Sequence, residues 1–212
     1  MANEIRSFFL EGPAGRLEAL LNTGDENATH AAVVCHPHPV YGGTMHNKVV
    51  YHATKTLNEF GFPVLRFNFR GAGRSEGEHD NGRGEVDDVR AALDWLEREF
   101  TVPIVFAGFS FGAGVGLRVA CADARVTAMI ALGTPVEAAG REYGYGFLRA
   151  CSKPKLFLSG TQDQYCPRER IEKVVQEAAP PKELVLIEGA DHFFEGRLGE
   201  VQKAMREWVE KL

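Results

Sequence analysis

Two patterns of apolar residues alternate along most of this chain. Short, almost continuous apolar runs are typical of buried strands, whereas apolar residues that recur every three or four positions are typical of amphipathic helices. The runs predict strands at residues 31–35, 63–69, 102–107, 126–132, 154–159 and 184–187, and the helical spacing predicts helices at 47–60, 84–100 and 198–208. Continuous apolar strands that alternate with helices predict an α/β fold, with a mostly parallel twisted sheet and helices on both of its faces.

The first part of the chain has a different pattern. Segments 5–11 and 16–21 flank Gly12-Pro-Ala-Gly15, and this arrangement predicts an N-terminal β-hairpin. Between the strands predicted at 126–132 and 154–159 the chain is too short for a cap domain. With 212 residues and no linker-like stretch, residues 1–212 are predicted to form a single domain.

Composition narrows the classes of partner. The apolar fraction of 44%, the charged fraction of 25% and the net charge of −5 are typical of a globular protein and offer no basic face for nucleic acid. The start of the chain has no basic region followed by an apolar segment, and no run approaches the length of a membrane span, so we expect a cytoplasmic protein. The four cysteines form no C-x-x-C pair and do not suggest a disulfide framework.

The candidate chemistry begins at Gly108-Phe-Ser110-Phe-Gly112, which follows the strand predicted at 102–107 and precedes small residues that can open a helix. In a G-x-S-x-G nucleophile elbow the serine occupies a sharp turn between strand and helix, where its hydroxyl is exposed. The alternative is a glycine-rich helix start in which Ser110 is only an N-cap. An acid and a histidine later in the chain, each just past a strand, favour the elbow.

The acid and the base are predicted in the loops that follow two later strands. Asp163 follows the strand at 154–159, and His192 follows the strand at 184–187. Because polar residues beyond the carboxyl ends of different strands converge at one edge of an α/β sheet, Ser110, Asp163 and His192 can meet there. Asp191 is the rival acid, but a residue directly beside His192 would have to fold back to reach its ring.

These residues carry a family resemblance. The chain resembles the α/β-hydrolase superfamily over nearly its whole length, since Asn68-Phe-Arg-Gly-Ala-Gly-Arg-Ser-Glu-Gly77 looks like the loop after the fourth strand of these enzymes. The segment from Cys35 to Lys48 is similar to the oxyanion loop of the small, capless bacterial branch often described as dienelactone-hydrolase-like. Dienelactone hydrolases use a cysteine nucleophile, whereas this chain has Ser110, so their substrate is not carried over.

The resemblance implies acyl transfer with a backbone oxyanion hole. One donor is expected to be the N–H of Phe111, the residue after the nucleophile. The second is expected in the loop after residue 35, where prolines have no N–H to give, so His38 is the first choice with Tyr41 and Gly42 in reserve. Tyr41, Gly42, Phe193 and Tyr145 are the candidate substrate-binding residues.

The histidines after residue 35 and the glycines after Ser110 are also candidate ligands for a metal ion or a nucleotide cofactor. His36, His38 and His46 match no zinc-ligand spacing, and the glycines at 112, 114 and 116 break the G-x-G-x-x-G register, so neither a metal nor a nucleotide cofactor is expected. Residues 141–148 are aromatic and glycine-rich; they form either a mobile lip or a packed segment with exposed tyrosines.

The expected function is therefore that of a serine hydrolase with no cofactor, acting through an acyl-enzyme on carboxylic esters or thioesters of small acyl groups. The expected partner is a small-molecule ester. A peptidase or amidase on the same scaffold, and a binding protein with a vestigial triad, remain open alternatives, as does the oligomeric state.

Overall fold

The computed structural model describes residues 4–138 and 140–212, so the first three residues of the domain predicted at 1–212 lie outside the described residues. The strands of the main sheet are β1 (Ile5–Gly12), β2 (Gly15–Asn22), β3 (Ala31–Cys35), β4 (Val64–Phe67), β5 (Ile104–Phe109), β6 (Val126–Leu132), β9 (Lys155–Gly160) and β10 (Lys182–Ile187). The α-helices are α1 (Lys48–Asn58), α2 (Glu85–Glu99), α3 (Phe111–Ala122), α4 (Arg168–Glu177) and α5 (Leu198–Val209). Two short 3-10 helices are η1 (Pro39–Tyr41) and η2 (Gly146–Ala150), and a small hairpin joins β7 (Glu137–Ala138) to β8 (Arg141–Glu142).

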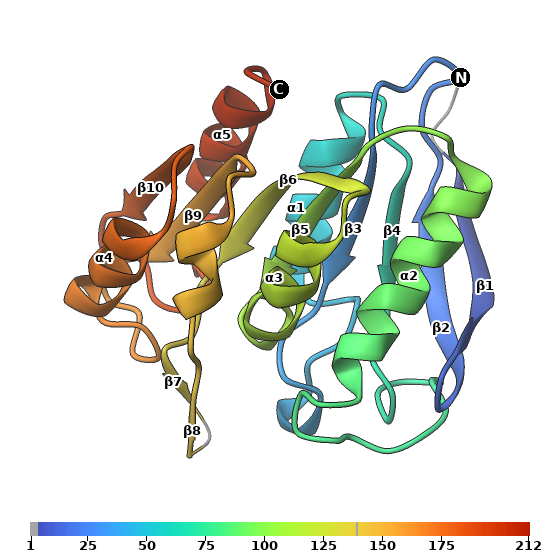
Figure 1. Ribbon diagram of the computed structural model, residues 1–212, viewed down its shortest axis with the longest axis horizontal. Helices are drawn as coiled ribbons and strands as arrows, with labels where there is room; N and C mark the ends of the chain where they lie inside the picture. The colour runs from blue at the N-terminus through green and yellow to red at the C-terminus, as the bar shows by residue number, and fades with distance from the viewer. Residues whose placement is uncertain (1–3, 139) are drawn as a thin grey trace.

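One twisted sheet organises the molecule (Figure 1). Its strand order is β1-β2-β4-β3-β5-β6-β9-β10. In this sheet β2 pairs antiparallel with both β1 and β4, and the other described pairings are parallel. The predicted mostly parallel sheet and the predicted N-terminal hairpin are therefore confirmed.

Alternate residues of the central strands pack into two separate hydrophobic cores, one on each face of the sheet. In β3, Val33 and Cys35 pack into a core that includes residues of α2, α3 and α4, whereas Ala32 and Val34 pack into a core with α1 and α5. Helices thus cover both faces of the sheet, as the continuous apolar strands predicted, because a strand buried on both sides needs apolar residues at every position.

The segment between β6 and β9 contains the hairpin β7–β8 and the 3-10 helix η2 rather than a cap domain. The tyrosines of residues 141–148 were expected to be exposed if this segment packs, but Tyr143 and Tyr145 are both buried, and so is Leu148. The expectation of exposed tyrosines was wrong, because both rings join the core on the side of α3.

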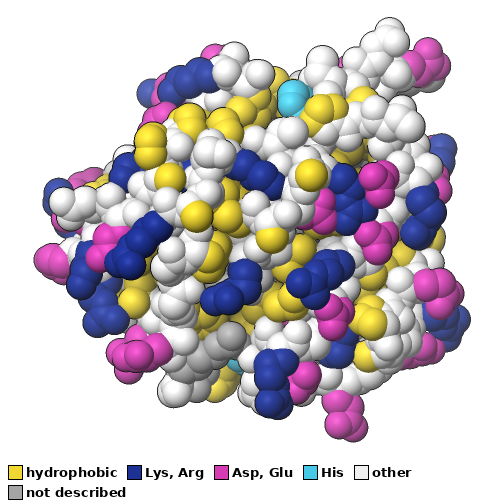
Figure 2. All heavy atoms as spheres, in the orientation of Figure 1, with side chains coloured by type: hydrophobic (Ala, Val, Ile, Leu, Met, Phe, Trp, Pro, Cys, Tyr) yellow, Lys and Arg dark blue, Asp and Glu magenta, His cyan; other side chains and the backbone are white. Residues whose placement is uncertain are grey.

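On the face seen in Figure 2, basic and acidic side chains are interspersed. No described helix combines the length and apolar character needed to cross a bilayer.

Candidate active site

The turn between β5 and α3 holds Ser110 in an unusual conformation. Its φ is 52° and its ψ is −118°, values that a residue with a side chain adopts only when the surrounding structure imposes them. The backbone N–H of Ser110 donates to Leu132 O of β6 over 2.9 Å, which fixes the turn against the next strand. Although Ser110 stands at the N-cap position of α3, its side chain makes no capping hydrogen bond. Its hydroxyl is left to make other contacts.

The two glycines of the motif are required by close packing. A Cβ atom at Gly108 would lie 2.7 Å from the backbone N of Ala113, and one at Gly112 would lie 2.5 Å from the carbonyl O of Cys35. Each neighbour is backbone and cannot turn aside as a side chain could. Only glycine at these two positions therefore allows the turn to pack this closely against its own helix and against the end of β3.

Ser110, His192 and Asp163 form a continuous hydrogen-bonded chain. Nε2 of His192 lies 2.8 Å from Oγ of Ser110, and its Nδ1 lies 2.9 Å from Oδ2 of Asp163. The exposed fraction of the side chain is 2% for the histidine and 0% for the aspartate. Because an ionised carboxylate only accepts, Nδ1 carries the proton and the lone pair of Nε2 faces the serine hydroxyl. The imidazole is thus oriented to take a proton from Ser110.

The carboxylate of Asp163 is itself fixed by its own loop. Its Oδ1 accepts the backbone N–H groups of Tyr165 and Cys166 over 2.8 and 3.1 Å, which leaves Oδ2 for the histidine. Both ring nitrogens of His192 are bonded to Ser110 and Asp163, so the rival acid, Asp191, is not the partner of the imidazole. Its Oδ1 accepts the N–H groups of Phe193 and Glu195, so it closes the turn that follows β10.

Phe111 and His38, the residues expected to donate to the oxyanion, line the same cavity as Ser110. Phe111 is the first residue of α3, so its N–H has no acceptor within the helix and lies at the positive end of the helix dipole. The ring of His38 packs against the ring of Phe111 with centroids 4.8 Å apart, and both residues line the same cavity. The reserve donors are engaged elsewhere, since the N–H of Tyr41 donates to His38 O and that of Gly42 to Pro39 O.

His36 fixes the loop that follows β3. Its Nε2 accepts the N–H of Phe69 over 2.9 Å, so Nδ1 carries the proton and donates to Pro37 O over 2.6 Å. Burial of the whole side chain lowers the pKa of His36 to about 4. This neutral imidazole ties the loop after β3 to the loop after β4. With both nitrogens bonded within the protein, it has no lone pair left for a metal ion.

Within residues 4–138 and 140–212, no three His, Cys, Asp or Glu side chains gather in a way that could hold a metal ion. His46 is exposed on the loop before α1.

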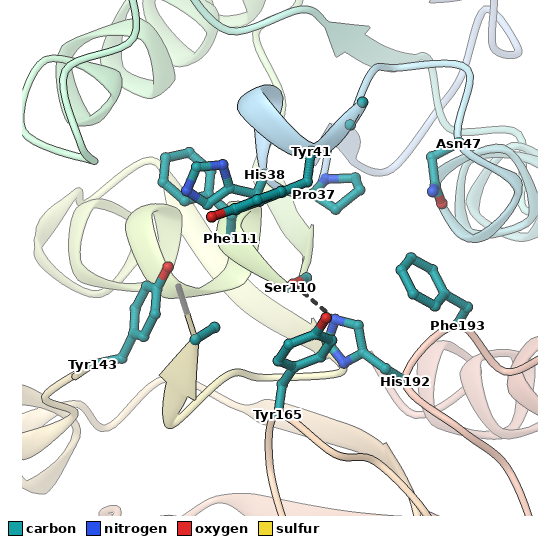
Figure 3. Close-up of a pocket in the computed structure, with 13 residues that line it drawn as sticks. Pro37, His38, Tyr41, Asn47, Ser110, Phe111, Tyr143, Tyr165, His192 and Phe193 are labelled. Carbon is teal, nitrogen blue, oxygen red and sulfur yellow. Dashed lines mark hydrogen bonds between the residues drawn. The ribbon is translucent and has the colours of Figure 1, made fainter. Parts of the chain in front are cut away.

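The Ser110 hydroxyl opens into a cleft with a volume of about 310 Å³ (Figure 3). The predicted binding residues Tyr41, Gly42 and Phe193 line it. Tyr145 does not line it, because its hydroxyl donates to Pro135 O within the core over 2.7 Å. The remaining lining residues, which were not predicted as substrate contacts, are Pro37, Gly43, Asn47, Ala138, Tyr143 and Tyr165.

A signal for two of these residues existed in the sequence. Tyr165 lies two residues after Asp163 in the same loop, and Tyr143 lies in the aromatic segment that was singled out for Tyr145. Ala138 and Asn47 carried no such signal, because their place at the cleft depends on how the β7–β8 hairpin and α1 pack.

Comparison with known proteins identifies the family of the chain. A family model described as "Alpha/beta hydrolase domain" matches residues 30–210. The chain is 36% identical over 208 residues to an uncharacterised protein of Rickettsia prowazekii, covering 95% of this chain and 87% of that protein. An alpha-beta serine hydrolase homologue from Coxiella burnetii is 40% identical with a TM-score of 0.86, over 98% of this chain and 97% of that one. A serine hydrolase without lid from Xanthomonas campestris is 31% identical with a TM-score of 0.87, over 100% of this chain and 96% of that one. The chain belongs to the α/β-hydrolase family, in its branch without a cap.

Proposed function

We propose that the protein is a serine hydrolase that cleaves carboxylic esters or thioesters of small acyl groups through an acyl-enzyme intermediate. The observation that carries this proposal is the hydrogen-bonded chain from Asp163 through His192 to Ser110, which ends at a strained serine in an open cleft. The hydrolase fold and its serine-hydrolase relatives support it.

In the first half of the reaction, Oγ of Ser110 attacks the carbonyl carbon while Nε2 of His192 takes the hydroxyl proton. Asp163 keeps the imidazole in the correct tautomer and stabilises the imidazolium that forms. When the tetrahedral intermediate collapses, Nε2 gives its proton to the departing alkoxide or thiolate. The alcohol or thiol leaves, and the acyl group remains on Ser110.

In the second half, water takes the place of the alcohol. His192 removes a proton from the water as its oxygen attacks the acyl carbon, and returns that proton to Oγ of Ser110 when the new tetrahedral intermediate collapses. The carboxylic acid leaves and the serine is restored. No redox cofactor or metal ion enters this sequence of steps.

The oxyanion of both intermediates is assigned to the N–H groups of Phe111 and His38. Phe111 offers a helix-terminal N–H beside the nucleophile. His38 is preferred over Tyr41 and Gly42 because its ring packs on that of Phe111 at the cleft that Ser110 lines. One such donor typically contributes about 3 kcal/mol of transition-state stabilisation.

Four further attributes belong to the same proposal. Residues 1–212 act as one catalytic domain, the protein works in the cytoplasm, its partner is a small ester, and nucleic acid is not a ligand. The acidic net charge of −5 supports the last of these.

The test combines covalent labelling with kinetics. A fluorophosphonate probe should add to Ser110, as located by mass spectrometry of the digested protein, and the Ser110→Ala variant should take up no label. The same variant should lose hydrolysis of p-nitrophenyl butanoate by about 10³-fold or more with an unchanged circular dichroism spectrum. EDTA should leave the wild-type rate unchanged. Retained hydrolysis in the folded Ser110→Ala protein would remove this assignment.

A further inference from the structure

Exposed aromatic side chains gather at the mouth of the cleft. Among the described residues, the exposed large hydrophobic side chains are Ile5, Val40, Tyr41, Tyr51, Tyr165, Phe193 and Leu212. Three of these line the cleft around Ser110: Tyr41 is 72% exposed, Phe193 44% and Tyr165 37%. Single exposed apolar residues need no explanation, but a group that rims one concave site marks a binding surface.

The ring of Tyr165 is exposed, but both its backbone N–H and its backbone carbonyl are hydrogen-bonded within the protein. Its N–H donates to Oδ1 of Asp163 over 2.8 Å, and its carbonyl accepts the N–H of Val136 over 3.2 Å. The ring packs edge-on to His192 with centroids 4.7 Å apart. Tyr165 is therefore held beside the proposed catalytic base rather than left on a loose surface loop.

Phe193 is presented in a similar way on the other loop. Its N–H donates to Oδ1 of Asp191 over 3.1 Å, and the next residue, Phe194, has a φ of 52° and is fully buried. This strained turn sends one phenylalanine into the core and the other into the cleft, where its ring lies 5.2 Å from that of His192. A positive φ is energetically unfavourable for a bulky residue, and the hydrogen bonds of the turn offset this cost.

Tyr41 covers the opposite wall of the cleft. It ends the 3-10 helix η1, and its ring packs on His38 with centroids 4.8 Å apart. In Figure 3, Tyr41 lies beside His38 and Phe111 on one side of Ser110, Tyr165 and Phe193 lie on the His192 side, and Tyr143 lies farther from Ser110. The space beside Ser110 is thus bordered by aromatic rings held on separate turns.

The aromatic lining of this space favours a planar ring over a flexible chain. Without a cap, the cleft cannot enclose an alkyl chain on all sides, whereas an aromatic ring gains contact through its two faces and its edge. The volume of about 310 Å³ is at the lower end of the range of ligand pockets, which is about 300–1,000 Å³, and suits one ring with an ester group.

We propose that the site is specific for esters that carry an aromatic ring, held against Tyr41, Tyr165 and Phe193 while Ser110 attacks the carbonyl. This inference rests on the proposed function and narrows its substrate class. The ring can belong to the acid or to the alcohol, and two pairs of substrates distinguish these sources.

The experiment compares esters that differ only in whether their ring is aromatic, so that the ester bond that reacts is the same in both. On the acid side, methyl 3-phenylpropanoate is compared with methyl 3-cyclohexylpropanoate; on the alcohol side, 2-phenylethyl acetate is compared with 2-cyclohexylethyl acetate. An aromatic ring contact favours the aryl ester by about 2- to 12-fold in kcat/KM. We expect such a ratio in at least one pair, and the pair that shows it identifies the side that carries the ring.

Variants connect the ratio to the named rings. In Tyr41→Leu and Phe193→Leu the ratio of aryl to cyclohexyl kcat/KM should fall toward one, and because both substrates are measured on the same variant, a general effect on catalysis cancels. Tyr51→Leu is the matched control: this tyrosine is 46% exposed on α1 and does not line the cleft, so the ratio should stay at the wild-type value.

The outcomes separate this inference from the proposed function. If the protein hydrolyses methyl butanoate and the wild-type ratio is one in both pairs, the aromatic specificity is wrong and the serine hydrolase remains. If no ester is hydrolysed, binding decides. Saturable binding of one of the two aryl esters by Ser110→Ala in calorimetry, with weaker binding of its cyclohexyl counterpart, supports the aromatic site, and equal binding within both pairs overturns it.

Discussion

Acidification should destabilise the protein through His36, a residue outside the proposed catalytic steps. Its imidazole is fully buried and neutral, with Nδ1–H donating to Pro37 O and Nε2 accepting the N–H of Phe69. Protonation would place a second N–H on Nε2, directly against the N–H of Phe69. It would also charge a group that has no contact with solvent.

The sign and size follow from the difference between the folded and unfolded states. Burial lowers the pKa of His36 from its ordinary 6.5 to about 4 in the folded protein. Above pH 6.5 both states hold a neutral imidazole and this stabilisation is fully present. As the pH falls from 6.5 toward 4, the unfolded chain binds the proton first, so the free energy of unfolding decreases by about 2 kcal/mol at pH 5 and by about 3 kcal/mol at pH 4.

Urea denaturation at pH 7.5 and pH 5 measures this quantity in the wild type and in His36→Leu. The leucine variant should be less stable at pH 7.5, since Phe69 N–H and Pro37 O lose their partner, at a cost of about 1–3 kcal/mol. Its loss of stability on going to pH 5 should be smaller than that of the wild type by about 2 kcal/mol. The exposed His46, changed to leucine, is the control and should keep the wild-type difference. Identical pH differences in wild type and His36→Leu would refute the reasoning.

Two further pairs of substitutions test the assignment of the acid and the packing of the glycines. Asp163→Asn should lower kcat by up to about 10⁴-fold, because it favours the wrong histidine tautomer. Asp191→Asn should have a far smaller effect, because an amide oxygen can still accept the N–H groups of its turn. A reversed ranking in steady-state kinetics would assign the acid to Asp191. Gly112→Ala should lower the free energy of unfolding by about 1–3 kcal/mol, since its Cβ would meet Cys35 O at 2.5 Å. Gly199→Ala, in α5 with no atom within 4 Å of the new Cβ, should instead be stabilising by about 0.5–1 kcal/mol, and equal effects of the two in urea denaturation would contradict the packing argument.

Much of this fold could be predicted because buried parallel strands are apolar at every position. Residues 31–35 and 126–132 were recognised in this way and coincide with β3 and β6. Helix α4 was not predicted, and the reason is physical: only Ile171 and Val175 of its residues are buried, so most of its sequence is polar. A helix that covers the outer part of a sheet with so narrow an apolar stripe resembles a surface loop in its pattern.

The lining of the cleft was harder to predict than the residues proposed for catalysis. Tyr143 and Tyr145 alternate with glycines, and nothing local distinguishes which ring faces the cleft. The difference arises from a distant residue, since a Cβ at Gly114 of α3 would lie 2.5 Å from Cε1 of Tyr143. The absence of a side chain on another element makes room for one tyrosine, while the other is held by Pro135 O.

The choice between the two acids illustrates how sheet order decides what sequence adjacency cannot. Asp191 stands beside His192 in the chain, yet an aspartate side chain readily accepts the N–H of the residue two positions ahead, and this is the bond that Asp191 makes to Phe193. An acid that approaches the imidazole end-on must come from another loop. In the sheet β9 pairs with β10 in parallel, so the loops that follow these two strands emerge side by side and bring Asp163 to His192. Asp163 and His192 are 29 positions apart because the chain forms α4 and then β10 before it returns to the same edge of the sheet.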